Sequence, residues 1–271
     1  MISIPALPLL RWFRWPLLAL WLVVPVFAQE TITIGALFSL SGDAASHGRA
    51  AQAVLQTAIE DFNQAFQQNP DRTPYKAQAI LFDTKSDPQV ALERLQYLAS
   101  VGVKVVLGPL TSAELFAVKD YADQQNLMLI STTSTAPSLA IENDSVFRLT
   151  PDDTHQGWAT AALMQRRQTK AVAVLHLDDL FGQELADTTL LHFIEGGGEV
   201  LGRWVFSSGT TDFSAILQQV QQRIDEAKTT TPSASIGVYV IGFDEIASLC
   251  RQAQAYTSLA SCLWYGSDGT A

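Results

Sequence analysis

Cysteine is nearly absent from this chain: among 271 residues only Cys250 and Cys262 occur. No metal-ligand spacing involves either of them, which argues against a cysteine-based metal site. In an oxidising compartment the two thiols could pair, because one lies on a predicted helix and the other opens the next predicted strand. Two unpaired, partly buried thiols fit the sequence about as well, so the pairing stays open.

Lysine and arginine are also scarce, with 17 of them against 27 aspartates and glutamates and a formal net charge of −10. A protein that binds nucleic acid needs a basic face to meet the phosphates. We therefore expect no nucleic-acid partner. An acidic surface suits a soluble secreted protein and says little more about function.

The usual catalytic signatures are missing as well. There is no G-x-G-x-x-G after the first predicted strand, no G-x-x-x-x-G-K-[ST] loop, no G-x-S-x-G turn and no H-E-x-x-H pair. His176 ends a predicted strand near Asp178 and Asp179, which leaves a secreted α/β hydrolase as an alternative. A polar strand end that faces a cleft is favoured, because neither a second metal ligand nor a nucleophile accompanies them. The sequence therefore predicts no enzyme, no metal and no cofactor.

The N-terminus carries the pattern of a signal peptide. Arg11 and Arg14 precede an apolar run at residues 17–27, and Ala28 stands at the expected cleavage position. The run is shorter than the ~18 residues that a membrane-spanning helix needs, so an uncleaved anchor is the minor alternative. No cysteine follows the run, which argues against a lipoprotein. We expect residues 1–28 to be removed and the protein to lie outside the cytoplasm.

The rest of the chain alternates apolar, β-rich runs with helical periodicity. Strands are predicted at residues 31–38, 77–82, 103–107, 127–130, 146–149, 171–177, 199–206, 236–241 and 262–265. Helices are predicted at residues 44–67, 88–101, 112–124, 182–195, 211–228 and 245–256. Alternation of this kind predicts parallel sheets with helices on both faces.

The series of strands and helices starts again near residues 150–153, and the two halves are roughly similar. We therefore predict an α/β fold of two doubly wound parallel-sheet lobes, at residues 29–150 and 151–271. The first long helix is expected to bury one face, composed of Ala50, Ala53, Val54, Ala58, Ile59 and Phe62. Asp87 is expected to cap the second helix, with Pro88 in its first turn.

Polar residues follow several of the predicted strands. They occur at residues 108–112 and 131–135 in the first half and at residues 266–269 in the second. Open α/β sheets bind ligands at the carboxyl ends of their strands. Hydroxyls from one half and the Asp268 carboxylate from the other suit a zwitterion. Ser112 opens a helix whose free N–H groups favour an anion, although it is also an ordinary N-cap, as Asp268 is an ordinary turn residue.

A family resemblance rests on eight short motifs, taken in order and at their separations. They are residues 35–42 (GALFSLSG), 83–88 (DTKSDP), Gly108-Pro109 with Ser112, 134–139 (STAPSL), 147–153 (FRLTPDD), 181–182 (FG), 211–214 (TDFS) and 266–269 (GSDG). In these motifs the chain resembles type I periplasmic solute-binding proteins of the branched-chain amino acid (Leu/Ile/Val-binding) class, which serve ABC importers. Extracellular domains of glutamate-type receptors share this fold.

The resemblance implies roles for four polar residues. Ser112 stands where a family hydroxyl binds the ligand α-carboxylate, and Thr135 matches a threonine that contacts both the α-carboxylate and the α-amino group. Thr133 matches a residue that contributes backbone contacts. Asp268 matches the acid of the second lobe that pairs with the α-ammonium.

It also implies an aromatic wall. Phe181 matches an aromatic residue, usually tyrosine, that closes over the ligand, and His47 falls in the loop after residues 41–42, where an aromatic shapes the side-chain pocket. Phe243 or Gly242 lies near another pocket position. Family members continue past the acid-bearing turn with elements that return to the first lobe, so the resemblance implies that this sequence lacks that return.

The expected function is capture of an amino acid, branched-chain or otherwise neutral, between two lobes that close about a hinge. The resemblance implies a monomeric, extracytoplasmic component of an ABC importer that docks on a membrane permease. A domain that senses amides, urea or amino acids for a signalling partner is a second possibility.

Overall fold

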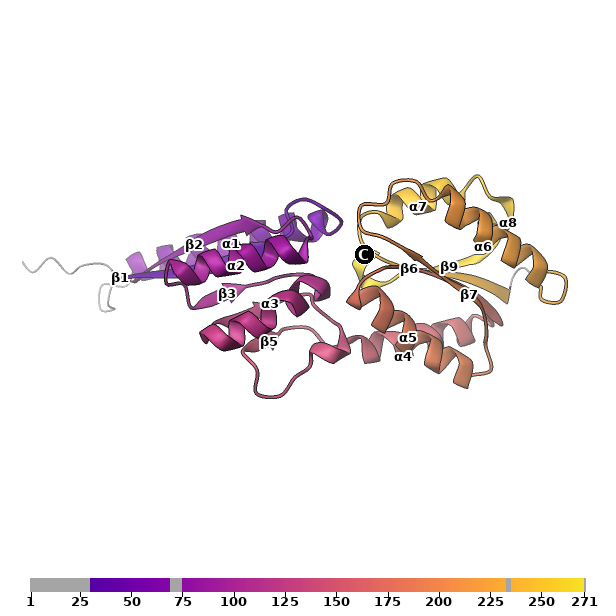
Figure 1. The fold of residues 1–271 in the computed structure, drawn as a ribbon, viewed down its shortest axis with the longest axis horizontal. Coiled ribbons are helices and arrows are strands. Elements are labelled where there is room, and N and C mark those ends of the chain that lie inside the picture. Colours follow the sequence, from indigo (N-terminus) through magenta and orange to yellow (C-terminus); the bar gives the residue numbers. More distant parts are fainter. Residues whose placement is uncertain (1–29, 69–74, 233–234, 271) are drawn as a thin grey trace, which may run out of the picture.

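The computed structural model describes residues 30–68, 75–232 and 235–270. The predicted signal peptide at residues 1–28 lies outside these ranges and stays a prediction. Two parallel sheets lie side by side, each with helices on both faces (Figure 1). This arrangement confirms the predicted α/β class. The sheets fall on either side of residues 150 and 151, where the boundary between two lobes remains a prediction.

The first sheet has five strands in the order β2-β1-β3-β4-β5, all parallel. Its strands are β1 (Glu30–Phe38), β2 (Tyr75–Asp83), β3 (Val105–Leu107), β4 (Met128–Ser131) and β5 (Val146–Arg148). Its helices are α1 (Ala45–Gln67), α2 (Pro88–Ser100), α3 (Ser112–Gln125) and the short η1 (Pro137–Leu139). Asp87 caps α2 through the backbone N–H groups of Gln89 and Val90, as predicted.

The sheet faces differ in what covers them. Leu37 of β1 packs with α2 and α3, whereas its neighbours Ala36 and Phe38 pack with α1 on the opposite face. Alternate residues of a strand point to opposite faces, so a single strand serves both layers. The ends of β3 and β4, which carry the polar residues 108–112 and 131–135, lie side by side at one edge of this sheet.

The predicted buried face of α1 is only partly correct: Ile59 packs against the core and Phe62 is half-buried, but the other four predicted residues are exposed. Val54 is 69% exposed, while the adjacent Leu55 is 8% exposed and lies against the sheet. Gly48 explains the orientation: a Cβ at this position would lie 2.0 Å from the carbonyl oxygen of Ser39, so α1 touches the chain after β1 here. Only glycine permits that approach, because it lacks a Cβ. The close contact rotates α1 so that the helix face with Leu55 lies against the sheet and the face with Val54 is exposed.

The second sheet has four parallel strands in the order β7-β6-β8-β9. Its strands are β6 (Ala171–Leu177), β7 (Glu199–Phe206), β8 (Ile236–Ile241) and β9 (Leu263–Tyr265). Helices α4 (Asp153–Arg166) and α5 (Leu180–Glu195) cover one face. Helices α6 (Ser214–Ala227), α7 (Ile246–Ala253) and α8 (Thr257–Ala260) cover the other (Figure 1). The turn η3 (Asp268–Thr270) follows β9.

Helix α4 is absent from the sequence prediction. Its buried positions include Gly157, Ala161 and Met164, whereas Trp158 is 62% exposed, so its apolar residues do not form the one-sided stripe that identifies most helices. The helix is nevertheless capped by Asp152, whose side chain accepts from the N–H of Thr154. This unpredicted helix turns out to touch the ligand site twice.

The cysteines do not pair. Cys250 and Cys262 are both free and half-buried, and the Cys262 thiol lies 3.2 Å from the carbonyl oxygen of Ser258. Burial raises the pKa of both thiols. Of the two open alternatives, the structure therefore has unpaired thiols. Across residues 30–68, 75–232 and 235–270, no helix combines the length and apolar character required to cross a membrane.

Candidate ligand-binding site

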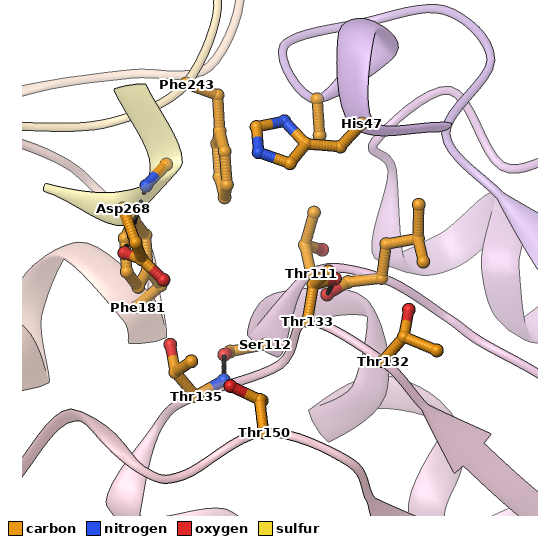
Figure 2. Close-up of a pocket in the computed structure, with 13 residues that line it drawn as sticks. His47, Thr111, Ser112, Thr132, Thr133, Thr135, Thr150, Phe181, Phe243 and Asp268 are labelled. Atoms are coloured by element: carbon orange, nitrogen blue, oxygen red, sulfur yellow. Dashed lines mark hydrogen bonds between the residues drawn. The ribbon is translucent and has the colours of Figure 1, made fainter. Parts of the chain in front are cut away.

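A cavity of about 220 Å³ lies between the two sheets, at the carboxyl ends of their strands. Figure 2 shows Ser112 and Thr135 at its base, Asp268 at one side, and the rings of Phe243 and His47 above them. Its wall is formed by Ala44, His47, Leu110, Thr111, Ser112, Thr132, Thr133, Thr135, Thr150, Phe181, Phe243, Asp268 and Gly269. All six residues predicted for the site therefore meet around one cavity.

Ser112 is the first residue of α3, but it is not the cap of that helix. Thr111 is the N-cap: its side chain accepts from the N–H of Glu114, and the Glu114 carboxylate accepts in return from the N–H of Thr111. The ordinary N-cap interpretation of Ser112 is thus wrong. The Ser112 hydroxyl oxygen instead accepts from the N–H groups of Thr135 at 3.3 Å and Ala136 at 3.2 Å.

The start of α3 is anchored from below by a buried carboxyl. Glu114 is fully buried and accepts from the hydroxyls of Thr111 at 2.8 Å and Ser39 at 3.2 Å. Burial raises the pKa of Glu114, and the hydroxyl and N–H donors around it oppose that shift. These bonds tie the end of β1 to the first turn of α3. The N–H groups of that turn, which have no partners within the helix, are thereby held toward the cavity.

The loops after β3 and β4 are joined to each other by hydroxyl groups. Ser131 donates to the carbonyl oxygen of Pro109 at 2.7 Å, and Thr133 donates to that of Leu110 at 2.7 Å. Thr133 therefore lines the cavity with its hydroxyl already engaged, which fits the predicted backbone role. The Thr135 hydroxyl donates to the Asp153 carboxylate at 2.8 Å.

Asp268 comes from the second sheet and is held by an amide. The Gln156 side chain donates to one Asp268 carboxylate oxygen at 3.0 Å and accepts from the Asp268 N–H at 3.3 Å. Asp268 is exposed, and within the described part of the chain it forms no ion pair. A carboxylate in this position is available to a cationic group of a ligand.

Three rings close the remaining wall. Phe181 is 3% exposed and stacks on Phe243 with ring centroids 5.2 Å apart. His47 meets the same Phe243 edge-on at 6.0 Å. His47 lies in the first turn of α1, within the predicted helix at residues 44–67 and not in the loop that the resemblance implied. Phe243, which the sequence assigned only loosely, is the centre of the cluster.

Six lining residues were not named as site residues by the sequence analysis: Ala44, Leu110, Thr111, Thr132, Thr150 and Gly269. All but Ala44 lie in the turns that follow predicted strands. Their position at the sheet edge was the available signal, but threonines are common in such turns and do not stand out there.

His176, the histidine of the hydrolase alternative, has hydrogen-bond partners at both ring nitrogens. His176 is 1% exposed, its Nε2 accepts from Arg203 at 2.7 Å, and its Nδ1 lies 2.7 Å from the carbonyl oxygen of Leu177. Burial lowers the pKa of His176. Asp179 caps α5 through the N–H of Gly182. Both ring nitrogens thus serve the structure, and this group has no arrangement of a nucleophile and base.

Comparison with known proteins gives a consistent result. A family profile described as Periplasmic binding protein matches residues 31–256. An uncharacterized protein of Methanocaldococcus jannaschii is 29% identical over 249 residues, covering 90% of this chain and 58% of that protein. Leu/Ile/Val-binding protein homolog 3 of Brucella melitensis is 26% identical over 196 residues, covering 72% of this chain and 52% of that protein.

Among solved structures, the branched-chain amino acid transporter substrate binding protein of Streptococcus pneumoniae, in complex with isoleucine, aligns with a TM-score of 0.73. Its sequence is 24% identical, and the alignment covers 89% of this chain and 65% of that one. The chain thus spans between about half and two thirds of the length of the proteins it matches. Because the family profile extends over both sheets, the chain belongs to the periplasmic binding protein family.

Proposed function

We propose that this chain binds a neutral amino acid in the cavity between its two sheets, as the extracytoplasmic receptor of an ABC importer. One observation carries the proposal. The first turn of α3, with the hydroxyls of Ser112 and Thr135, faces the unpaired carboxylate of Asp268 across a single cavity. A zwitterion matches both ends of that arrangement.

The two ends favour opposite charges. An α-carboxylate beside Ser112 would meet the positive end of the α3 dipole and N–H groups that lack helical partners. An α-ammonium beside Asp268 would form charge-assisted hydrogen bonds, which are about twice as strong as neutral ones. The ligand is thereby oriented with its carboxylate toward the first sheet and its ammonium toward the second.

The third side of the cavity selects the ligand side chain. Leu110, Phe243 and Ala44 give it an apolar surface, and among the described residues that line the cavity there is neither lysine nor arginine. An acidic ligand side chain would therefore lose its solvation without gaining a cationic partner, which is costly. An aliphatic or other neutral side chain is favoured, in line with the names of the relatives.

The ligand contacts come from both sheets, so binding favours the arrangement in which the sheets are close together. We expect the closed protein to dock, as a monomer, on a membrane permease. A sensor domain would capture its ligand in the same way and pass the closed state to a signalling partner. Co-purification with a permease distinguishes the importer from the sensor.

Thermal unfolding with each common amino acid at millimolar concentration tests the proposal. A ligand present at ~100 times its Kd stabilises the folded protein by about 2.7 kcal/mol, which raises the Tm by several degrees. The Asp268→Asn variant should bind ~10–100-fold more weakly because a charged hydrogen bond is lost. Asp212→Asn, an exposed aspartate bonded only to Ser214, is the matched control and should bind normally. A cooperative transition that no amino acid shifts would refute the proposal.

A further inference from the structure

The first turn of α4 touches both ends of the ligand site. Asp153 accepts from the hydroxyl of Thr135, and three residues later Gln156 holds Asp268. Residues at this spacing lie on the same face of a helix. We propose that Asp153 and Gln156 are positioning residues. Asp153 sets the direction in which the Thr135 hydroxyl donates its hydrogen bond, and Gln156 fixes the orientation of the Asp268 carboxylate. This inference rests on the function proposed above.

Asp153 fixes the direction of the Thr135 hydroxyl. An ionised carboxylate can only accept, so the single hydroxyl proton of Thr135 points at Asp153, 2.8 Å away. The oxygen of Thr135 then offers only lone pairs to the cavity. The same two residues are joined a second time, by the N–H of Asp153 and the carbonyl oxygen of Thr135 at 2.9 Å. Thr135 therefore presents an acceptor, which suits the N–H groups of an ammonium.

Ser112 has the opposite polarity. Its oxygen already accepts from the N–H groups of Thr135 and Ala136. A hydroxyl has two acceptor positions, so both are used and only the proton remains. That proton can point to Ser134, 3.1 Å away, or to a ligand carboxylate. The hydroxyls of Ser112 and Thr135 thus present one donor and one acceptor to the cavity. The donor matches the carboxylate of an α-amino acid, and the acceptor matches its ammonium group.

Gln156 completes the acceptor end. Its amide both donates to the carboxylate of Asp268 and accepts from the Asp268 N–H, so the side chain and backbone of this exposed turn are fixed together. Without Gln156, Asp268 would have to be ordered when the ligand arrives, and that ordering reduces affinity. Helix α4 thereby links Asp268, which lies 112 residues after Gln156 in the sequence, to the loop that holds Thr135.

The polarity of Thr135 depends on the charge of Asp153. Asp153 is 1% exposed, and the carboxylates around it are Asp152 at the helix cap, Glu184 on α5 and Asp268 on η3. Tyr239 of β8 contributes only a buried hydroxyl, which lies near the hydroxyls of Thr160 and Thr189. Burial, reinforced by these carboxylates, raises the pKa of Asp153 to about 7. Once protonated, Asp153 can donate to Thr135, whose own proton then turns toward the cavity and opposes an ammonium.

The expected consequence is a proton linkage. The protein binds the ligand more tightly when Asp153 is ionised, so ligand binding lowers the pKa of Asp153. Affinity is therefore highest above about pH 7 and declines as the pH falls. For one linked proton, Kd rises roughly tenfold per pH unit below that value. Acidification thus releases the ligand through protonation of Asp153, which acts on the ligand through Thr135.

Calorimetric titration of the purified protein with L-leucine, L-isoleucine, L-valine, L-threonine and L-alanine, between about pH 5.5 and 8.5, tests this. Asp153→Asn keeps an oxygen for Thr135 but cannot titrate, so its affinity should not vary with pH. Asp152→Asn removes one of the carboxylates that raise the pKa of Asp153, so its affinity should still vary with pH, with the decline at a lower pH than in the wild type. Gln156→Ala should weaken binding ~10-fold, whereas His155→Ala, an 83% exposed neighbour, should not. His47→Gln controls for the histidine in the cavity and should keep the pH dependence.

The outcomes separate the two proposals. Wild-type protein that unfolds cooperatively but binds none of the five amino acids refutes the neutral amino acid function and this inference with it. Binding that is independent of pH in the wild type, or equally pH-dependent in Asp153→Asn, refutes the inference alone. Should Asp153→Asn fail to unfold cooperatively, Thr135→Val takes its place, since it removes the hydroxyl that Asp153 directs and should also abolish the pH dependence.

Discussion

The backbone N–H of Asp244 donates to the carbonyl oxygen of Asp43 at 3.0 Å, and this bond joins the two halves of the molecule beside the cavity. Both side chains add to it. The Asp43 carboxylate accepts from the Ser208 hydroxyl and the Gly209 N–H, and the Asp244 carboxylate accepts from the N–H of Ser46 at 2.9 Å. Each half supplies one aspartate to the other, so the two halves are in direct contact beside the cavity.

Asp43→Ala should therefore weaken ligand binding without unfolding the protein. The closed form would lose two charged hydrogen bonds to the second half, and we expect Kd to rise roughly tenfold. Calorimetric titration measures the effect, and small-angle scattering should show a more open molecule in the absence of ligand. Asp178→Ala is the control, because Asp178 contacts only Gln183 within its own half. Equal affinity of the Asp43 variant and the wild type would show that this contact does not stabilise closure.

Glu114 is expected to matter for stability more than its distance from the ligand suggests. Glu114→Ala removes the acceptor of Thr111 and Ser39, both buried, and leaves their donors without partners. The free energy of unfolding should fall by about 2–4 kcal/mol. Chemical denaturation measures this change. Glu93→Ala, an exposed glutamate on α2, should change it by less than about 0.5 kcal/mol. A similarly small change for Glu114 would contradict the anchoring role.

The sequence predicted the fold well wherever one pattern dominated. The strands at 171–177 and 236–241 match the structure residue by residue, because continuous apolar runs bounded by polar turns identify buried parallel strands. The strand at 199–206 matches as well, although it contains Glu199 and Arg203 and is partly exposed. Helix α1 was found but most of its buried face was not, since Gly48 decided its rotation through a backbone contact that no periodicity reveals. Local patterns report which element forms, and long-range contact decides how that element lies.

The site could be predicted to a similar extent. The polar residues at 108–112, 131–135 and 266–269 stood out because they follow predicted strands, and the family resemblance selected Ser112, Thr135 and Asp268 among them. Asp153 and Gln156 were missed as functional residues, because they belong to α4, whose scattered apolar residues gave no helical signal. Their partners lie 18 and 112 residues away in the sequence, and such pairings are visible only in the folded chain.

Stability should increase as the pH falls from about 8 toward 5. Burial raises the pKa of Asp179 to about 6 and that of Glu245 to about 7, and Asp43 lies near both. Burial also raises the pKa of Asp153 to about 7. Groups whose pKa is higher in the folded state bind protons on folding, so the folded state gains stability below those values and loses it above them.

Thermal unfolding across this range measures the effect, and we expect the Tm to rise by about 3 °C or more on acidification. Glu245→Gln removes one of the three groups and should flatten the curve between about pH 6 and 8. Glu142→Gln, an exposed glutamate, should leave the curve unchanged. A Tm that falls steadily over the same range would mean that these carboxyls ionise normally in the folded protein.

The two phenylalanines of the cavity should separate stability from affinity. Phe181 is 3% exposed and packs with Leu185 and Tyr239 in the core of the second half, whereas Phe243 is half-buried and meets His47 in the cavity. Phe181→Ala leaves a void in the core, so we expect a loss of about 3–5 kcal/mol in unfolding free energy together with weaker binding. Phe243→Ala should cost less stability and still reduce affinity, because the ring covers the ligand more than the core.

Denaturation and ligand titration of both variants give the comparison, with Phe147→Ala as control because that ring is 51% exposed and distant from the cavity wall. The expected order of stability is Phe147→Ala, then Phe243→Ala, then Phe181→Ala. The ligand affinities should follow another pattern: the Phe147 variant should bind as tightly as the wild type, and the other two variants should bind more weakly. If Phe243→Ala bound its ligand as tightly as the wild type, the stacked pair would be a core feature alone, and the apolar side of the cavity would have to be formed by Leu110 and Ala44.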